Sequence, residues 1–468
     1  MKKFVLLLGD IILLYSSLAL TLWIRYGHVN TSIWTRHFWP FSIIFAVWLM
    51  VFFINGLYEI NKVRTGFKFY GNLVQNLIIN ALLAVALFYS ILGRFTSLKP
   101  QTVLLILLAI FTVLFLIWRK LFYRLISSDR LGNNLAVVGV SEESLLLAEE
   151  VITKPQLGYK LKLIVNPDRS PLPEKFQMIS SSRDLVDLKN QLVKYKINTV
   201  VALSSPKYGA DVARYLFESI DLKIQYYDLT DFYEKITGKI PVTVLERNWF
   251  LENISQRNKE WLVGAKRIID ILFAVFFGLI SLIFLPFIAI AIKLESKGPL
   301  IYKQERVGLA GKIFTVYKLR SMTINAETNG AQWAAADDKR VTKIGKFMRQ
   351  TRIDEIPQFW NIIKGNMSFV GPRPERPEFV TQLKEAIPFY NERHLVKPGL
   401  SGWAQINYPY GASIEQAKEK LQYDLFYIKN QSIALDISII LKTINTVFNK
   451  KEIIACKFAI LIDIPSSQ

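Results

Sequence analysis

Two adjacent acidic residues, Asp354 and Glu355, lie in the stretch RQTRIDEIPQFWNIIKGNMSFVGPRPE of a chain whose formal net charge is +20. Pro357 follows them, and proline is tolerated in the first turn of a helix but not in its interior. The sequence therefore predicts a helix that begins near Asp354, with both carboxylates at its positive end. Arg349 and Arg352 lie just upstream, so a carboxylate here is expected to stay ionised at neutral pH, as a nucleophile that attacks phosphorus must.

The second carboxylate, Glu355, is a candidate ligand for Mg²⁺. This ion prefers oxygen ligands and is often shared between one or two carboxylates and substrate phosphates. The pair also has a simpler interpretation, because an N-cap Asp354 followed by an acidic residue in the first turn is a common way to begin a helix. The neighbouring motifs decide between the two.

Cationic side chains recur in these motifs. FTVYKLRSM is typical of a strand that runs into a turn, which puts Lys318 and Arg320 on the same face at strand spacing. There they would either meet a diphosphate or form a solvated charged face. In GPRPE the flanking prolines restrict the backbone around Arg373. A guanidinium held in this way suits a phosphate, because it donates two hydrogen bonds at once.

Other segments of the chain must position these residues, and the first of these segments along the chain are apolar. The hydrophobic content of 51% is high for a soluble chain of 468 residues. Early segments close to the ~20 residues that cross a bilayer predict a transmembrane four-helix bundle within residues 1–125; they are 4–24, 38–57, 73–92 and 102–118. A signal peptide is disfavoured, because the first segment lacks a clear small-x-small cleavage site. The basic residues of the loops favour an inside N-terminus, so the chain beyond these helices is expected to begin in the cytoplasm.

Residues 130–250 alternate short β-type runs with helical patterns. The runs NLAVVGV, KLKLIVN, NTVVALS and LKIQYYD predict a Rossmann-like, doubly wound α/β domain. Only Gly139 stands where a dinucleotide fingerprint has three glycines. A regulatory or structural role is therefore favoured over dinucleotide binding. The single cysteine, Cys456, excludes an internal disulfide and fits a reducing compartment.

A second apolar region, residues 264–296, is long enough to span a bilayer. Pro286 lacks an N–H group and predicts a break or kink within it. Both flanks are basic, which is not typical of an outer loop. We therefore expect a re-entrant membrane helix with both ends in the cytoplasm rather than a spanning helix. Arg267 and Asp270, at a spacing of i, i+3, are expected to face each other at its mouth.

The last domain, residues 297–450, has more Lys and Arg than Asp and Glu. It is expected to attract anions and the anionic lipids of the inner leaflet. Nucleic acid is disfavoured as the partner, because the sequence has no recognised nucleic-acid-binding module and the domain is tied to a bilayer.

Four motifs, YKQERVG, FTVYKLRSM, RQTRIDEIPQFWNIIKGNMSFVGPRPE and VKPGLSGWAQIN, follow the proline-containing apolar region in that order. Together they resemble the bacterial polyprenyl-phosphate glycosyl-1-phosphate transferases, membrane enzymes that begin the assembly of exopolysaccharide, capsule or O-antigen. The resemblance covers about residues 264–449, and the parts before it resemble the long members of that family. It implies a monotopic catalytic domain with amphipathic helices on the bacterial inner membrane, facing the cytoplasm.

The resemblance also implies a reaction in two steps. Asp354 attacks the sugar-bearing phosphate of a UDP-sugar and releases UMP, and undecaprenyl phosphate then takes the hexose 1-phosphate from the aspartate. Glu355 would hold Mg²⁺. The residues implied to bind phosphate or the nucleotide diphosphate are Lys318, Arg320, Arg349, Arg373 and Arg306. A homodimer is a further expectation.

Two other functions remain open at this point. A membrane-anchored nucleotide-sugar epimerase or dehydratase needs a dinucleotide loop and usually a Tyr-x-x-x-Lys pair, and that spacing occurs only at Tyr58 and Lys62. A non-enzymatic scaffold of a glycan-assembly complex would not need the acidic pair. The sequence does not indicate which sugar is carried, and the tail 451–468 has no predicted role.

Overall fold

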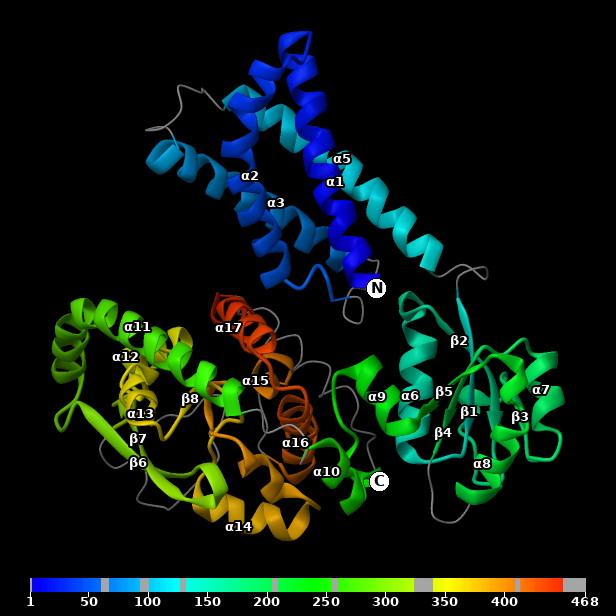
Figure 1. Cartoon of the computed structure of the whole chain (residues 1–468). Coiled ribbons are helices and arrows are strands. Elements are labelled where there is room, and N and C mark those ends of the chain that lie inside the picture. The colour runs from blue at the N-terminus through cyan, green and yellow to red at the C-terminus, as the bar shows by residue number, and fades with distance from the viewer. Residues whose placement is uncertain are drawn as a thin grey trace, which may run out of the picture. The chain divides into compact units, whose positions relative to one another are not determined.

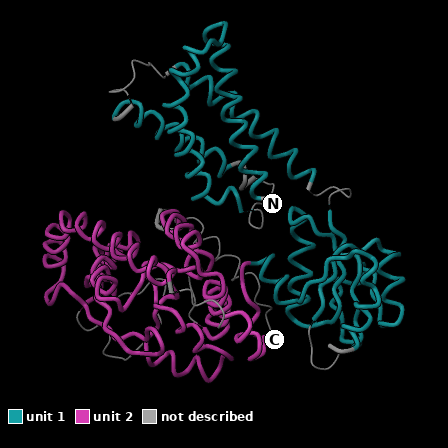
Figure 2. Tube along the Cα trace, in the orientation of Figure 1, with its two compact units in different colours: residues 1–237 teal, residues 238–468 magenta. Residues whose placement is uncertain are grey.

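The computed structural model describes residues 2–59, 67–92, 101–126, 132–203, 209–254, 260–323, 340–408 and 413–448. The tail 451–468 and Lys62 therefore lie outside the described residues. The chain divides into two compact units, Met1–Thr237 and Gly238–Gln468 (Figure 2). Each unit is considered by itself below.

The predicted apolar segments near the N-terminus are helical (Figure 1). Their bounds are α1 Lys2–Tyr26, α2 Thr31–Ile54, α3 Phe67–Leu87 with a π-helical extension Phe88–Leu92, and α5 Gln101–Ile126. All four are long and apolar enough to cross a membrane. Pro40 lies inside α2 without ending it.

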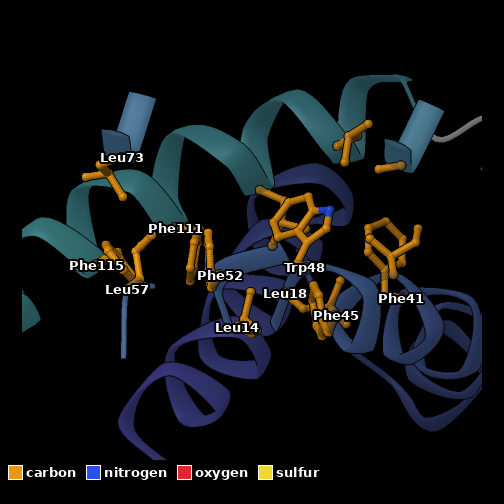
Figure 3. Close-up of a cluster of buried hydrophobic side chains, with 14 of the residues drawn as sticks. Leu14, Leu18, Phe41, Phe45, Trp48, Phe52, Leu57, Leu73, Phe111 and Phe115 are labelled. Atoms are coloured by element: carbon orange, nitrogen blue, oxygen red, sulfur yellow. The ribbon is translucent and has the colours of Figure 1, made fainter. Parts of the chain in front are cut away.

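Aromatic side chains from these helices form one buried cluster (Figure 3). Trp48 is fully buried, its ring centroid lies 5.9 Å from that of Phe111, and its indole N–H donates to the carbonyl of Asn80 over 2.9 Å. Gly9 permits close contact between α1 and α5, because a Cβ atom there would lie 2.2 Å from the ring of Trp118. Large apolar side chains and one small residue thus hold the helices together.

A buried ion pair also links α1 to α5. Arg119 Nη2 lies 2.6 Å from Asp10 Oδ2, and the exposed fractions of the two side chains are 1% and 0%. Arg119 also donates to the carbonyl of Leu57 over 3.0 Å. Charges this deeply buried are tolerated only when they are paired and hydrogen-bonded, so the pair fixes the relative position of these helices.

The rest of the first unit is an α/β domain, as predicted. Its five strands are all parallel in the order β3-β2-β1-β4-β5. The strands are β1 Asn133–Val138, β2 Tyr159–Val165, β3 Ser180–Ser182, β4 Thr199–Ala202 and β5 Gln225–Asp228. The longer helices are α6 Glu142–Thr153, α7 Leu188–Lys194, α8 Gly209–Phe217 and α9 Leu229–Thr237.

The turn after β1 is the place where a dinucleotide loop would lie. Gly139 has a positive φ of 93°, and a Cβ atom there would lie 2.9 Å from the Cβ of Leu203. The side chain of Leu203 therefore packs against the glycine that a pyrophosphate would approach. This contact agrees with the absence of a three-glycine fingerprint, and a regulatory or structural role for the domain stays a prediction.

The second unit begins at Gly238, before the boundary at residue 250 that the sequence suggests. Ile240, Val242 and Leu245 are buried in the core of this unit. The indole N–H of Trp403 donates to the carbonyl of Gly238 over 2.8 Å. The segment that leads through α10, Arg247–Asn253, thus packs with the C-terminal domain, because its apolar side chains complete that core.

The long apolar helix α11 spans Glu260–Glu295 and contains Pro286. Its helical structure continues on both sides of the proline, and the ribbon bends between a longer and a shorter arm (Figure 1). A bend at proline is expected, because the ring removes one backbone hydrogen bond. Most of the apolar side chains of α11 are exposed, and only 11% of its apolar stretch is buried within the protein.

Short elements follow α11. An antiparallel hairpin consists of β6 Ile301–Val307 and β7 Ile313–Leu319, and two separated strands, β8 Ser368–Val370 and β9 Gly399–Ser401, pair in parallel. The helices are α12 Lys343–Thr351, α13 Gln358–Lys364, α14 Pro377–Ala386, α15 Trp403–Asn407, α16 Ile414–Lys429 and α17 Ile433–Phe448. One apolar cluster joins side chains of α11, β7, α13 and β8 to those of α14, α16 and α17.

Candidate active site

The acidic pair lies on a single 3₁₀ turn, Ile353–Glu355, between α12 and α13. The sequence predicts one helix that begins near Asp354, but α13 begins only at Gln358, with Pro357 at its N-cap. Arg352 accounts for the difference, because its left-handed backbone (φ 60°) ends α12 and redirects the chain into a tight turn. Each of the two acidic residues is 6% exposed.

Three cations converge on one oxygen atom of Glu355. Its Oε1 accepts a hydrogen bond of 2.6 Å from Arg373, and it lies 3.5 Å from Lys318 Nζ and 3.5 Å from Arg352 Nη1. Burial alone would raise the pKa of Glu355, but these three cations outweigh it and hold the pKa well below its usual value. Glu355 is therefore an anion at neutral pH.

Asp354 is in a different electrostatic position. Burial first, and then the charge of Glu355, raise the pKa of Asp354, although Lys318 and Arg349 oppose the shift. This direction differs from the expected dominance of the upstream arginines, because the neighbouring anion and desolvation act against them. Asp354 Oδ1 is buried and has no hydrogen-bond partner among the described residues. Adjacent carboxyl groups with pKa values shifted apart are typical of functional sites.

Lys318 and Arg320 bind different partners, although both lie in the motif FTVYKLRSM. Lys318, on β7, faces Glu355, and burial lowers the pKa of its ammonium group to about 8 while Glu355 raises it. Arg320 donates to the carbonyl of Ser296 over 2.6 Å instead. The structure therefore brings Lys318 to the acidic turn and directs Arg320 toward the end of α11. Arg349 donates to Ser321 Oγ over 2.9 Å, and its charge acts on Asp354.

Glycines in the motifs VGPRP and KPGLSG allow two strands to meet beside the site. A Cβ atom on Gly399 would lie 2.1 Å from the backbone nitrogen of Gly371. One on Gly371 would lie 2.3 Å from the carbonyl oxygen of Lys397. No side chain fits at such distances, so these glycines are needed to place the turn that carries Arg373.

Arg306, which the resemblance assigns to phosphate, lies beside this same turn. Its guanidinium donates to the carbonyl of Pro374 over 3.0 Å and to Gln304 Oε1, and it lies 3.8 Å from a carboxylate oxygen of Glu375. These contacts tie Arg306 to the protein backbone, and its direct contact with phosphate stays a prediction.

Arg267 and Asp270, expected to face each other, each bind the C-terminal domain instead. Arg267 donates to the carbonyls of Ile362 and Ile363 over 2.5 and 2.7 Å. Asp270 Oδ1 accepts from Ser368 Oγ at 3.1 Å and from the Phe369 amide at 3.0 Å. Helix α13 exposes carbonyl groups at its C-terminal end, where a cation is favourable. The two residues thus anchor the first part of α11 beside the strand that precedes the Arg373 turn.

The other end of α11 is anchored to the same domain. The carboxylate of Glu295 accepts from the backbone amides of Lys343 and Ile344 over 2.6 and 2.9 Å, at the start of α12. Ile292 packs in a small apolar cluster with Leu319 and Met348. Both arms of the helix therefore contact elements that also carry the acidic turn and its cations.

Several polar residues that lie outside the assigned site also support this arrangement. Asn361 accepts from the backbone amide of Tyr317 and donates to the carbonyl of Thr315, which joins α13 to β7. Arg393 and Asp424 form a buried ion pair of 2.9 Å. No local spacing signals such pairs, because their members are brought together only by the tertiary fold.

The residues of the site are compatible with Mg²⁺ only if the substrate also supplies ligands. Among the described residues, no group of three or more His, Cys, Asp and Glu could hold a metal ion. Mg²⁺ is commonly bound by one or two carboxylates together with phosphate oxygens. The unpartnered Asp354 Oδ1 and the ionised Glu355 provide such a donor set.

The fold and the site together define a membrane-associated class of protein, in which an acidic turn lies among cations in a domain that carries a long apolar helix. The family model of the bacterial sugar transferase matches residues 261–450. A Bacillus subtilis protein named putative undecaprenyl-phosphate N-acetylgalactosaminyl 1-phosphate transferase is 50% identical over 140 residues, which are 30% of this chain and 78% of the relative. The chain belongs to the bacterial sugar transferase family.

Two longer relatives match over smaller shares of their length. A UDP-N-acetylgalactosamine-undecaprenyl-phosphate N-acetylgalactosaminephosphotransferase of Aeromonas hydrophila is 41% identical over 261 residues, 55% of this chain and 61% of the relative. A UDP-glucose:undecaprenyl-phosphate glucose-1-phosphate transferase of Escherichia coli K12 is 42% identical over 181 residues, 38% of this chain and 39% of the relative. The match thus covers less than two thirds of each of these two proteins.

Proposed function

We propose that this protein transfers a sugar 1-phosphate from a UDP-sugar to undecaprenyl phosphate and releases UMP. The observation that carries the proposal is the buried acidic turn, in which Glu355 is held by three cations while Asp354 keeps an unpartnered oxygen atom. The names of the relatives support both substrates. Neither an epimerase nor a scaffold accounts for this site. The sugar itself is left open, because the relatives are named for different sugars.

In the proposed first step, a carboxylate oxygen of Asp354 attacks the sugar-bearing phosphorus. A phosphorus–oxygen bond to the aspartate forms as the bond to UMP breaks, and UMP leaves with the bonding electron pair. Arg373 and Lys318 lie where they can stabilise the charge on the phosphoryl oxygens. In the second step, a phosphate oxygen of the lipid attacks the same phosphorus and restores the carboxylate of Asp354.

We propose that Glu355, together with the phosphate oxygens of the substrate, holds Mg²⁺. The ion would neutralise part of the phosphate charge. Glu355 has a second effect that needs no metal, because its charge holds Arg373, Lys318 and Arg352 near one another. A site prepared in this way needs little rearrangement during the reaction.

The four N-terminal helices are proposed to span the bacterial inner membrane, with α11 entering only the inner leaflet. A straight helix of 36 residues would be about 54 Å long. If it crossed ~30 Å of hydrocarbon, its ends would lie on opposite sides, yet Arg267 and Glu295 both bind the same domain. This pairing of contacts supports a re-entrant helix. The basic loop residues of the N-terminal helices support a catalytic domain in the cytoplasm, and its excess of Lys and Arg supports binding to anionic lipids. We also propose that two copies of the chain form a homodimer, which a measurement of the molecular mass in solution would test.

We expect UMP as the nucleotide product when the purified protein receives a UDP-sugar, undecaprenyl phosphate and Mg²⁺. Attack on phosphorus leaves one phosphate on uridine, whereas attack on the sugar carbon leaves two. A panel of UDP-sugars, with products separated by anion-exchange chromatography, measures this directly. Reactions without the lipid serve as the control for multiple turnover. Release of UDP would mean ordinary glycosyl transfer and would overturn the proposal.

We expect cysteines placed on both sides of α11 to be accessible only from the cytoplasm. Leu251 and Ile313 are suitable sites, because their exposed fractions are 65% and 59%. Each would be changed to cysteine in a Cys456→Ser background and treated with an impermeant thiol reagent in intact cells and in inverted vesicles. Val29→Cys, between α1 and α2, is the matched control and should react in intact cells. Reaction of Ile313→Cys in intact cells would instead indicate a spanning helix.

A further inference from the structure

Four consecutive backbone carbonyl groups of the turn that contains Arg373 accept hydrogen bonds from residues outside the turn. Its two prolines have no N–H group, so they cannot donate the backbone hydrogen bonds that would stabilise the turn from within. The acceptors Pro372, Arg373, Pro374 and Glu375 are bound, in that order, by the Gly399 amide at 2.9 Å, Arg393 Nη2 at 2.9 Å, Arg306 Nη1 at 3.0 Å and the Val307 amide at 3.0 Å.

Arg393 is the donor whose bond acts on Arg373 itself. Its guanidinium also donates to Asp424 Oδ2 over 2.9 Å and to the hydroxyl of Tyr390 over 2.7 Å. Arg393 and Asp424 are only 5% and 2% exposed. A buried charge pair is costly unless its hydrogen bonds are satisfied, and here the bond to the Arg373 carbonyl is part of that satisfaction.

The direction of the Arg373 side chain depends on where its backbone is held. Its guanidinium lies 2.6 Å from Glu355 Oε1, while its carbonyl is bound by Arg393. A shift of the backbone would therefore move the guanidinium away from the acidic turn. Arg393 itself contacts Tyr390, Asp424 and the turn backbone rather than the acidic pair.

We propose that Arg393, oriented by Asp424, is a positioning residue that directs Arg373 toward the anion bound at the acidic turn. The inference rests on the proposed function, in which that anion is the phosphate of the substrate. It gives a reason for a charged pair in the core of the domain. Through its bond to the Arg373 carbonyl, the pair holds the backbone of a residue in the site.

The test is a double-mutant cycle with Arg373. Removing only Arg393 would leave Asp424 buried and unpaired, so the variant of choice is Arg393→Met/Asp424→Leu, which replaces the pair with apolar side chains of similar volume. We expect kcat/KM for the UDP-sugar to fall by ~10- to 100-fold, the effect of misplacing a catalytic contact by about 1 Å. In an Arg373→Ala background the same pair of changes should have almost no further effect.

A second ion pair in the same unit provides the matched control. Lys239 pairs with Glu419 on α16, the helix that also carries Asp424. Lys239→Met/Glu419→Leu makes a similar chemical change at an ion pair of this unit, whereas the Arg373 carbonyl is bound by Arg393. Its effect on kcat/KM should be small and the same with and without Arg373. If the Arg393→Met/Asp424→Leu protein does not fold, Arg393→Lys replaces it, because lysine keeps the charge but cannot bind three partners from one planar group.

Binding of inorganic pyrophosphate separates failure of this inference from failure of the proposed function. Pyrophosphate affinity reports the cations at the acidic turn whether or not a sugar phosphate is transferred. We expect the loss of affinity in the Arg393 variants to vanish in the Arg373→Ala background. Equal losses of affinity in both backgrounds, or wild-type protein that does not bind pyrophosphate, would overturn the positioning role even if UMP is released.

Discussion

Asp354→Asn should lose turnover by roughly 10³-fold or more, the scale seen when an enzyme loses its nucleophile. Asparagine has nearly the same shape, so the turn Ile353–Glu355 should persist while the attacking negative charge disappears. The cations should keep their positions, because Glu355 keeps the ion pairs with Arg373 and Lys318. The measurement is UMP release, with the thermal midpoint of unfolding recorded for each protein.

Covalent labelling of the protein distinguishes two possible roles of Asp354, nucleophile and general base. With a UDP-sugar labelled in its sugar-linked phosphate and no lipid acceptor, wild-type protein should keep the label after denaturation, and Asp354→Asn should keep none. Glu385→Gln, which removes an exposed carboxylate on α14, is the matched control and should label like the wild type. Label that persists in Asp354→Asn, or robust turnover by wild-type protein that never labels, would favour direct transfer with Asp354 as a base.

Much of the architecture could be predicted from local patterns. Apolar runs of membrane-spanning length predict the N-terminal helices, and the alternation of strand-like and helical patterns predicts the parallel sheet. Strand β3 was missed, because Ser180–Ser182 has neither the β-branched nor the aromatic residues that indicate a strand. The sequence suggests an end of the α/β domain near residue 250, whereas the second compact unit begins at Gly238. The reason is that Ile240 and Val242 are apolar in either domain, and only packing decides which core they join.

Only those site residues that lie within the sequence motifs could be predicted as candidates. The structure brings together Asp354, Glu355, Lys318 and Arg373, which the motifs mark as site candidates, and their roles stay predictions. Residue spacing could not give the pairing of Arg320 with Ser296, because the backbone leaves the strand at that point. It could not give the buried pair of Arg393 and Asp424 either. Long-range partners of this kind depend on tertiary contacts, which a single sequence does not encode in any local period.

Glu355→Gln should reduce turnover on the order of 10²-fold, the scale of losing one strong electrostatic contact in an active site. The amide cannot neutralise Arg373, Lys318 and Arg352, which all approach Glu355 Oε1. Without that charge the three cations repel one another and leave the arrangement that receives phosphate. Glu355→Asp keeps the charge on a shorter side chain, so it should retain more activity than Glu355→Gln. Steady-state kinetics of UMP release measures both variants against the wild type.

A magnesium titration then distinguishes the two effects of Glu355. If Glu355 binds Mg²⁺, the amide is a weaker ligand, so the Mg²⁺ concentration for half-maximal activity should rise and excess Mg²⁺ should restore part of the loss. If Glu355 acts only by holding the cations, the midpoint should stay where it is in the wild type while the maximal rate falls. Arg352→Gln is the matched control, because it removes one of the cations, the one that approaches Oε1 at 3.5 Å, and leaves the carboxylate in place. A midpoint that moves in Arg352→Gln as far as in Glu355→Gln would contradict metal binding by Glu355, because metal affinity would then depend on the geometry of the cation cluster rather than on the carboxylate.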